Sequence, residues 1–334
     1  MKAFLRFILS IMLVLCVAGV TYLVLHFTFS LPAKPGDQST SLFVIAEQEG
    51  FRSVSKRLEQ QGFIRYSWVI NLIAKLKRKD TQVMAGEYEI SPGMTQEEIL
   101  ERFVSGKMLL RKITVREGAS IWEIGKLLQD AGIVTKASFE ASLTDPKLLE
   151  EAKITGPSFE GYLFPETYQF PKDTPIKKII WTMLSEFNKK WAPEFDARAQ
   201  FLGMNKSQLL TLASIIEKES GNSEDQPIIA SVFHNRLKKE MKLQSDPTVI
   251  YGIPNFNGNI TKNDLLAPTP FNTYVIAGLP PGPIANPGIT AIKATLFPAE
   301  TQYLFFVADN RGGHVFSEKL EDHNRAVSEF QKGK

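Results

Sequence analysis

Residues 117–134 read EGASIWEIGKLLQDAGIV, and residues 49–64 read EGFRSVSKRLEQQGFI, a shorter version of the same pattern. In both copies a strand-like apolar segment ends at Glu-Gly, a helix with apolar spacing follows, and a glycine, Gly62 or Gly132, stops the helix. The repeat therefore predicts two strand–helix modules. Modules of this kind are typical of an α+β fold.

A further strand and helix are expected between the two copies. Residues 86–90 alternate between polar and apolar side chains as a strand does, and Thr95, with two glutamates close behind, begins a helix. We therefore expect residues 42–145 to form one small α+β domain. Trp122, near the start of the second helix, is expected to anchor the core of this domain.

The N-terminal segment predicts a membrane anchor. Residues 7–31 contain no Asp, Glu, Lys or Arg, and this stretch is longer than the ~20 residues that a helix needs to cross the hydrocarbon core. Lys2 and Arg6 precede it while only Lys34 follows closely, so we expect a cytoplasmic N-terminus and an exported bulk. Residues 1–31 are thus the predicted cytoplasmic N-terminus and transmembrane helix.

The segment that follows the apolar run is expected to be a linker. Residues 32–41 are rich in Pro, Gly and small polar residues, which connect rather than pack. The alternative to an anchor is a cleaved signal peptide. However, the apolar core of a signal peptide is typically ~7–15 residues long, and no clear A-x-A cleavage site closes this run.

Composition excludes several classes of function. The net charge is only +3 over 334 residues and the basic side chains are dispersed, so no nucleic-acid partner is expected. Cys16, the one cysteine, lies in the apolar run, so disulfides and thiolate chemistry are not expected in the bulk of the chain. Neither a metal nor another cofactor is expected, because the histidines lack paired ligand spacing. They are His26, His234, His314 and His323.

Residues 146–334 are expected to form a mainly helical catalytic domain with long loops and a β-hairpin. Amphipathic helices are predicted from Ile176 and from Lys206, and a long Pro/Gly-rich loop ends at residues 286–288. Two short strand patterns near the C-terminus meet at Asn-Arg-Gly-Gly and predict the hairpin, which a closing helix follows.

Glu217, near the end of the second of these helices, is the candidate catalytic acid. Its helical neighbours at three and four residues are small, which leaves space for a substrate, whereas the opposite face of the helix is apolar. A partly desolvated carboxyl group has a raised pKa, as a general acid requires near neutral pH. Glu219 points about 200° away around the helix and is expected to be a solvated surface residue.

Two other segments carry candidate substrate contacts. Glu160 and Tyr162 lie in FEGYLFPETY, residues 159–168, whose aromatic rings and carboxylates suit sugar rings and hydroxyls. The alternative for Tyr162 is the core of the loop itself. Gln244 and Asp246 lie where the chain turns before a proline, and this polar cluster could instead cap the next helix.

Five motifs follow one another along the chain: FEGYLFPETY, EKES, HNRLKKEMKLQSDPTVIYG, LPPGPIANPG and HVFS. Together they resemble the MltG/YceG-like endolytic murein transglycosylases, and the resemblance covers nearly the whole chain. In that family the first Glu of the EKE triplet is catalytic, which corresponds to Glu217. Glu160, Gln244, Asp246 and Asn286 match the cleft motifs more loosely and are expected to bind substrate.

The resemblance implies a fold, a reaction and a location. The second strand–helix copy resembles the LysM-like subdomain of the family. The implied reaction cleaves the β-1,4 bond between N-acetylmuramic acid and N-acetylglucosamine without water, with Glu217 first as acid and then as base, and leaves 1,6-anhydro ends that terminate glycan elongation. The implied setting is a single-pass inner-membrane protein with a periplasmic catalytic domain, acting on peptidoglycan strands with peptidoglycan synthases as partners.

Two alternatives stay open at this stage. A muramidase-type hydrolase would pair Glu217 with Glu160 or Asp246 to activate water. A non-enzymatic scaffold would use the repeat to hold cell-wall synthases, with Glu217 as a structural acid.

Overall fold

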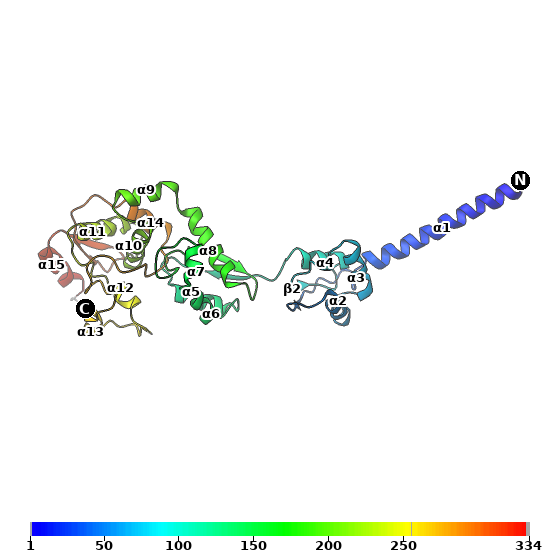
Figure 1. Cartoon of the computed structure of the whole chain (residues 1–334), viewed down its shortest axis with the longest axis horizontal. Coiled ribbons are helices and arrows are strands. Elements are labelled where there is room, and N and C mark those ends of the chain that lie inside the picture. The colour runs from blue at the N-terminus through cyan, green and yellow to red at the C-terminus, as the bar shows by residue number, and fades with distance from the viewer. Residues whose placement is uncertain (1, 255, 332–334) are drawn as a thin grey trace. The chain divides into compact units, whose positions relative to one another are not determined.

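The computed structural model describes residues 2–254 and 256–331 (Figure 1). Its internal contacts divide the chain into two compact units, Met1–Arg111 and Lys112–Lys334, which we call unit 1 and unit 2. The sequence analysis placed the domain boundary at residue 145, but the boundary lies at residues 111–112. Residues 112–145 belong to unit 2 because Ile124 and Phe139 are buried in the same hydrophobic core as Ile180.

Unit 1 begins with the long apolar helix α1, Lys2–Ser30. Its segment Phe7–Val24 is long and apolar enough to cross a membrane, and the side chains of that segment are exposed. A candidate single span therefore stands close to the N-terminus, in agreement with the predicted anchor.

The rest of unit 1 is a small sheet covered by helices. Strands β1, Ser41–Ile45, and β2, Gly86–Ile90, pair antiparallel with Phe43 opposite Tyr88. The helices are α2 (Phe51–Gln60), α3 (Ser67–Leu76) and α4 (Gln96–Val104). Alternate strand residues, including Phe43 and Tyr88, are buried against apolar faces of these helices. Thr95 begins α4 through a reciprocal capping box with Glu98, as the sequence predicts.

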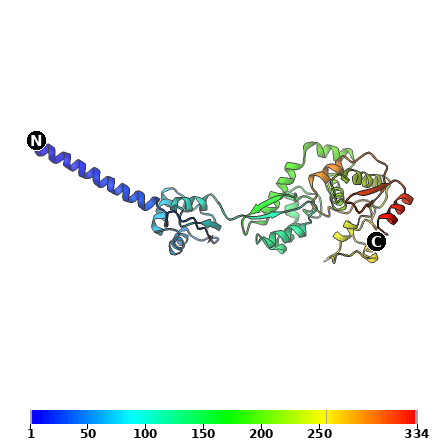
Figure 2. The ribbon, with the colours of Figure 1, turned by 180° about the vertical axis from the view of Figure 1, so that it is seen from behind.

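Unit 2 is mainly helical and contains two short sheets. Strand β3 pairs with β4, and β5 pairs antiparallel with β6 to form the predicted hairpin, with α15 packed beside it (Figure 2). The strands are β3 (Arg111–Thr114), β4 (Thr167–Phe170), β5 (Phe305–Ala308) and β6 (His314–Ser317). The helices are α5 (Ile121–Asp130), α6 (Lys136–Ser142), α7 (Pro146–Glu151), α8 (Ile176–Lys190), α9 (Pro193–Phe201), α10 (Lys206–Glu219), α11 (Gln226–Lys238), α12 (Asp246–Tyr251), α13 (Lys262–Leu266), α14 (Ile289–Leu296) and α15 (Leu320–Phe330).

Helix α10 is the central element of unit 2. Every residue from 209 to 216 is buried, because α10 packs against α14 and α11 and contributes to two hydrophobic clusters. Asn205 opens the helix through a capping box with Gln208. The carboxyl end of α10 carries Glu217 and Glu219, so a largely enclosed helix fixes the position of both acids.

Candidate active site

Glu217 lies in the last turn of α10 and is half-buried. Its Oε2 accepts a hydrogen bond from the backbone N–H of Gly288 at 2.9 Å. Gly288 is the N-cap residue of α14, so the acid is held at the amino end of a second helix. Among residues 2–254 and 256–331 no donor is found for Oε1, which leaves this oxygen available to a substrate.

The surroundings of Glu217 raise the pKa of its carboxyl group. Burial raises its pKa, the Gly288 N–H lowers it, and the negative charge of Glu117 raises it further. The ammonium group of Lys218 acts in the opposite direction and is the weakest of these influences. The net direction is upward, as a general acid requires.

The space beside Glu217 is not where the sequence placed it. Ala213 and Ser214, on the expected open face, are fully buried, because the Ser214 hydroxyl accepts a hydrogen bond from the Ile284 N–H of the long loop. The neighbour of the Glu217 side chain is instead Gly118, where a Cβ atom would lie 3.4 Å from Cγ of Glu217. The acid therefore faces the turn that precedes α5.

A groove of about 1010 Å³ begins at the residue next to the acid. Lys218 lines it and donates from Nζ to the Gly118 carbonyl at 3.3 Å. Aromatic rings form its far side: Trp122 and Tyr251 have ring centroids 4.7 Å apart, and Phe271 follows 4.8 Å beyond Tyr251. Trp122 is 41% exposed, so it lines the groove and is not the core anchor that we expected.

Glu160 and Asn286 form a buried polar network behind this groove. Asn286 Nδ2 donates to Glu160 Oε1 at 2.8 Å, and the Tyr251 hydroxyl donates to Glu160 Oε2 at 3.1 Å. Burial raises the pKa of Glu160 to about 8, although the hydrogen bonds donated by Ile121 and Tyr251 lower it. Both side chains are enclosed, which corrects the expectation that they contact substrate. Glu160 holds the hydroxyl of Tyr251, and Asn286 holds Glu160.

Asn286 also ties together three segments that are distant in sequence. Its Oδ1 accepts from the N–H groups of Gly161 and Leu163, both at 2.9 Å, and its Nδ2 donates to the Ala119 carbonyl. Gly161 has φ +87°, and a Cβ atom there would lie 2.5 Å from Cγ of Pro283. The FEGYLFPETY segment can therefore approach the long loop only with a glycine at this position.

Tyr162 belongs to the hydrophobic core and not to the groove. Its side chain is 4% exposed and its ring packs edge-on against Phe187 at 5.6 Å. The sequence left two interpretations of Tyr162 open, a substrate contact and the core of the loop, and the structure supports the core. The expected substrate contact of Tyr162 is corrected accordingly.

Glu219 is half-buried and not the solvated surface residue that we expected. The buried Ser245 hydroxyl donates to Glu219 Oε1 at 2.5 Å, and burial raises the pKa of Glu219 to about 7, with Asp246 raising it and Arg236 lowering it. The sequence missed this role because Ser245 lies 26 residues further along the chain. Helix geometry did separate the two acids correctly, since they have different partners.

Gln244 and Asp246 are exposed on the turn that leads into α12. Gln244 has φ +50°, and its N–H donates to the Thr273 carbonyl, which holds the turn. Asp246 Oδ1 accepts from the Tyr274 hydroxyl at 2.6 Å. The side chains of both residues stay accessible, as a substrate contact requires.

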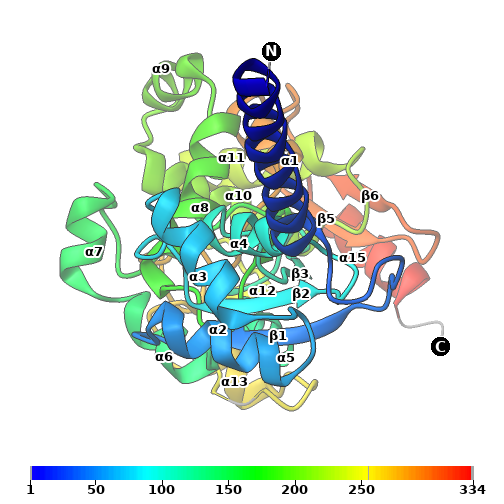
Figure 3. The ribbon, with the colours of Figure 1, turned by 90° about the vertical axis from the view of Figure 1, so that its right-hand side faces the viewer.

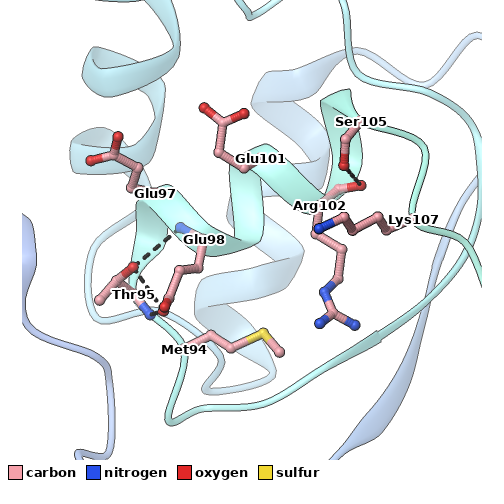
Figure 4. A pocket seen from close by; sticks show the side chains of 8 residues that line it. All are labelled: Met94, Thr95, Glu97, Glu98, Glu101, Arg102, Ser105 and Lys107. Carbon is pink, nitrogen blue, oxygen red and sulfur yellow. Dashed lines mark hydrogen bonds between the residues drawn. The ribbon is translucent and has the colours of Figure 1, made fainter.

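A second pocket, of about 500 Å³, lies on α4 in unit 1 (Figure 4). Its carboxylates are already engaged: Glu98 closes the capping box of α4, and Glu97 and Glu101 pair with lysines that follow α3. No group of three or more metal-ligating side chains is found in the part of the chain that the structure describes. The groove beside Glu217 is therefore the candidate active site.

An acid with a raised pKa next to an aromatic groove defines a class of site suited to acid catalysis on a large ring-bearing substrate. Residues 43–329 match the YceG-like family, and the chain belongs to it. It is 32% identical over 315 residues to an endolytic murein transglycosylase of Bacillus subtilis, covering 90% of this chain and 87% of that protein.

Two further comparisons agree with this family. An endolytic murein transglycosylase of Streptococcus pneumoniae (strain D39) is 31% identical over 336 residues, covering 90% of this chain and 60% of that protein. The crystal structure of a putative YceG-like protein from Listeria monocytogenes superposes with a TM-score of 0.60 at 31% identity, covering 86% of this chain and 98% of that one.

Proposed function

We propose that the chain is a lytic transglycosylase that cleaves peptidoglycan glycan strands, with Glu217 as its catalytic acid. One observation carries the proposal: Glu217, whose pKa is raised and whose Oε2 is held by the Gly288 N–H, lies next to Lys218, which lines an aromatic groove. The names of the similar proteins, endolytic murein transglycosylases, support the same activity.

The proposed reaction breaks the β-1,4 bond between N-acetylmuramic acid and N-acetylglucosamine. Glu217 donates its proton to the glycosidic oxygen, and the bond from the muramyl anomeric carbon to that oxygen breaks. The resulting carboxylate then removes the proton of the muramyl 6-hydroxyl, whose oxygen attacks the anomeric carbon and closes a 1,6-anhydro ring. The acid ends protonated again, and no water is consumed.

The groove would hold the strand through its rings and its polar rim. Trp122 and Tyr251 offer flat faces of the kind that stack against sugar rings. Gln244 and Asp246, both exposed, would donate and accept hydrogen bonds with sugar hydroxyls or support the developing positive charge. Glu160 and Asn286 keep the Tyr251 ring and the long loop in place.

An anchor formed by α1 would keep this chemistry close to a membrane. With α1 as a single span, the N-terminus lies in the cytoplasm and unit 2 lies on the periplasmic side, near nascent strands. Cleavage there would terminate glycan elongation. The second strand–helix copy, as a LysM-like element, would position glycan or a peptidoglycan synthase.

The test compares Glu217→Gln with Glu224→Gln, an exposed acid seven positions along the chain, on purified sacculi. Release of anhydro-muropeptides is expected to fall ~10³-fold or more for Glu217→Gln and to stay unchanged for the control. Mass spectrometry separates the alternatives, because a hydrolase adds the mass of water to its products. Wild-type release from Glu217→Gln would exclude Glu217 as the acid, and no release from any form would favour a scaffold.

A further inference from the structure

The outer face of α3 is apolar, although this helix lies at the surface of unit 1. Trp68, Leu72 and Leu76 follow one another at four-residue spacing and therefore share one face of the helix. They are 55%, 38% and 75% exposed, and Tyr66, whose ring lies 6.5 Å from that of Trp68, is 49% exposed.

This face is not needed for the core of unit 1. The opposite side of α3 already supplies the core with buried side chains, including Ile70 and Ile73. A surface helix of a soluble domain normally exposes a polar face, so an apolar one indicates that something covers it.

Positive charge gathers where α3 ends. Lys77 and Lys79 are neutralised by Glu97 and Glu101 of α4. Lys75 and Arg78 are exposed, and in residues 2–254 and 256–331 no carboxylate pairs with either of them. Aromatic and aliphatic side chains bordered by unpaired basic groups match the interface of an anionic bilayer, where rings sit at headgroup level and cations meet phosphates.

The same face begins beside the candidate membrane span. Arg65, one residue before Tyr66, donates from Nε to the carbonyl of Ala33, which lies three residues after the end of α1. Helix α1 also contacts α3 and α4 within unit 1 (Figure 3). A chain that leaves the bilayer at the end of α1 therefore brings the start of α3 to the level of the lipid headgroups.

We propose that the outer face of α3, residues 66–79, lies on the surface of the membrane that α1 crosses and binds its anionic phospholipids. Trp68 and Leu76 would enter the boundary between headgroups and acyl chains, and Lys75 and Arg78 would contact phosphates. This docking would fix the height of unit 1 above the bilayer. It rests on α1 as a span and not on the enzymatic activity.

The experiment uses the full chain in nanodiscs of phosphatidylglycerol and phosphatidylcholine. In a Cys16→Ser background, an environment-sensitive fluorophore is attached at Leu76→Cys or, as a matched control, at Leu42→Cys, on the sheet face turned away from the core. Quenching by doxyl lipid is expected to be at least about threefold stronger at position 76, because interfacial side chains lie ~5–10 Å inside the headgroup boundary.

A charge variant tests the lipid headgroup separately. Lys75→Glu with Arg78→Glu is expected to reduce doxyl quenching at position 76 to the control level, whereas Arg52→Glu with Lys56→Glu, on exposed positions of α2, leaves it unchanged. Equal quenching at positions 76 and 42 would overturn the proposal. Protection at position 76 from both aqueous iodide and doxyl lipid would overturn it too, by assigning the face to a protein, whether a second copy or a partner.

Discussion

Glu117 lies close enough to Glu217 for its negative charge to raise the pKa of the Glu217 carboxyl. Glu117→Gln removes this repulsion and keeps the side-chain size, so the pKa of Glu217 is expected to fall. Because a general acid works only while protonated, the basic limb of the pH profile of kcat/KM should move to lower pH. The profile is measured with soluble glycan strands.

The control for this shift is Glu300→Gln, an exposed acid on the loop between α14 and β5. Its pH profile is expected to match that of the wild type. A basic limb that moves to higher pH for Glu117→Gln, or does not move, would show that Glu117 does not tune the acid.

Asn286 is expected to be the most costly single polar side chain to remove from unit 2. Asn286→Ala leaves the N–H groups of Gly161 and Leu163 buried without the acceptor that they now share. The free energy of unfolding should fall by about 3 kcal/mol, since each unsatisfied buried group costs about 1–3 kcal/mol. Urea unfolding measures the loss.

Asn324→Ala, on the exposed side of α15, serves as the reference for that measurement. Its change should stay within about 0.5 kcal/mol, as surface substitutions usually do. A similar small value for Asn286→Ala would mean that the network adds little to stability.

Single residues were predictable from sequence only where local geometry decides. The spacing on α10 separated Glu217 from Glu219, and the structure gives them different partners, Gly288 and Ser245. The spacing could not show that Glu219 is enclosed or that Glu160 bonds to Tyr251. The contact of Glu219 with Ser245 spans 26 residues, and the contact of Glu160 with Tyr251 spans 91 residues. Contacts of that kind depend on how helices pack, which periodicity does not encode.

At the scale of elements, the strongest local signals were the reliable ones. The helix predicted from Lys206 is α10, the capping residue Thr95 begins α4, and the predicted hairpin is β5–β6. The stretch 145–171 is interrupted by prolines and glycines, which favour loops, yet it contains α7 and β4. Asp145 caps α7 over a proline at its first turn, and β4 forms because β3 supplies a partner from another segment.

The groove between α5 and α12 yields a prediction about these elements. Trp122→Ala removes the ring that packs on Tyr251 and is expected to raise KM for glycan strands about fivefold, because aromatic contacts of this kind contribute about 0.5–1.5 kcal/mol. The value of kcat should hardly change, since the acid is untouched. Steady-state kinetics measure KM and kcat for this variant, with Phe201→Ala, which removes an exposed ring on α9, as the control. A loss confined to kcat would contradict a binding role for Trp122.

At the scale of the whole molecule, the α+β class and the apolar N-terminal helix were predicted, but the division of the chain was not. The two strand–helix copies look alike in sequence, yet the first packs in unit 1 and the second in unit 2. The difference lies in partners: β1 pairs with β2, whereas β3 pairs with β4 beyond α7. A repeat reports the local fold of each copy but not the core that it joins.

The orientation of the chain in the membrane can be tested with an engineered thiol once its one native thiol, Cys16, is replaced. In intact spheroplasts, a membrane-impermeant maleimide should label Leu42→Cys in the Cys16→Ser background and should not label Cys16 in the wild type, because Cys16 lies within the apolar part of α1. Permeabilised cells provide the control for reagent access. Labelling of Leu42→Cys only after permeabilisation would contradict the proposed topology.

The loop from Leu279 to Gly288 contributes both to the groove and to the orientation of the Glu217 carboxyl group. Pro283 and Ile284 form part of the groove wall, while the N–H of Gly288, a few residues on, orients the acid. A glycan strand that pushes Pro283 and Ile284 outward is expected to shift the peptide unit of Gly288, which orients the carboxyl group of Glu217. Because both contacts belong to one loop, a poorly bound glycan strand that displaces the groove wall is expected to be cleaved slowly.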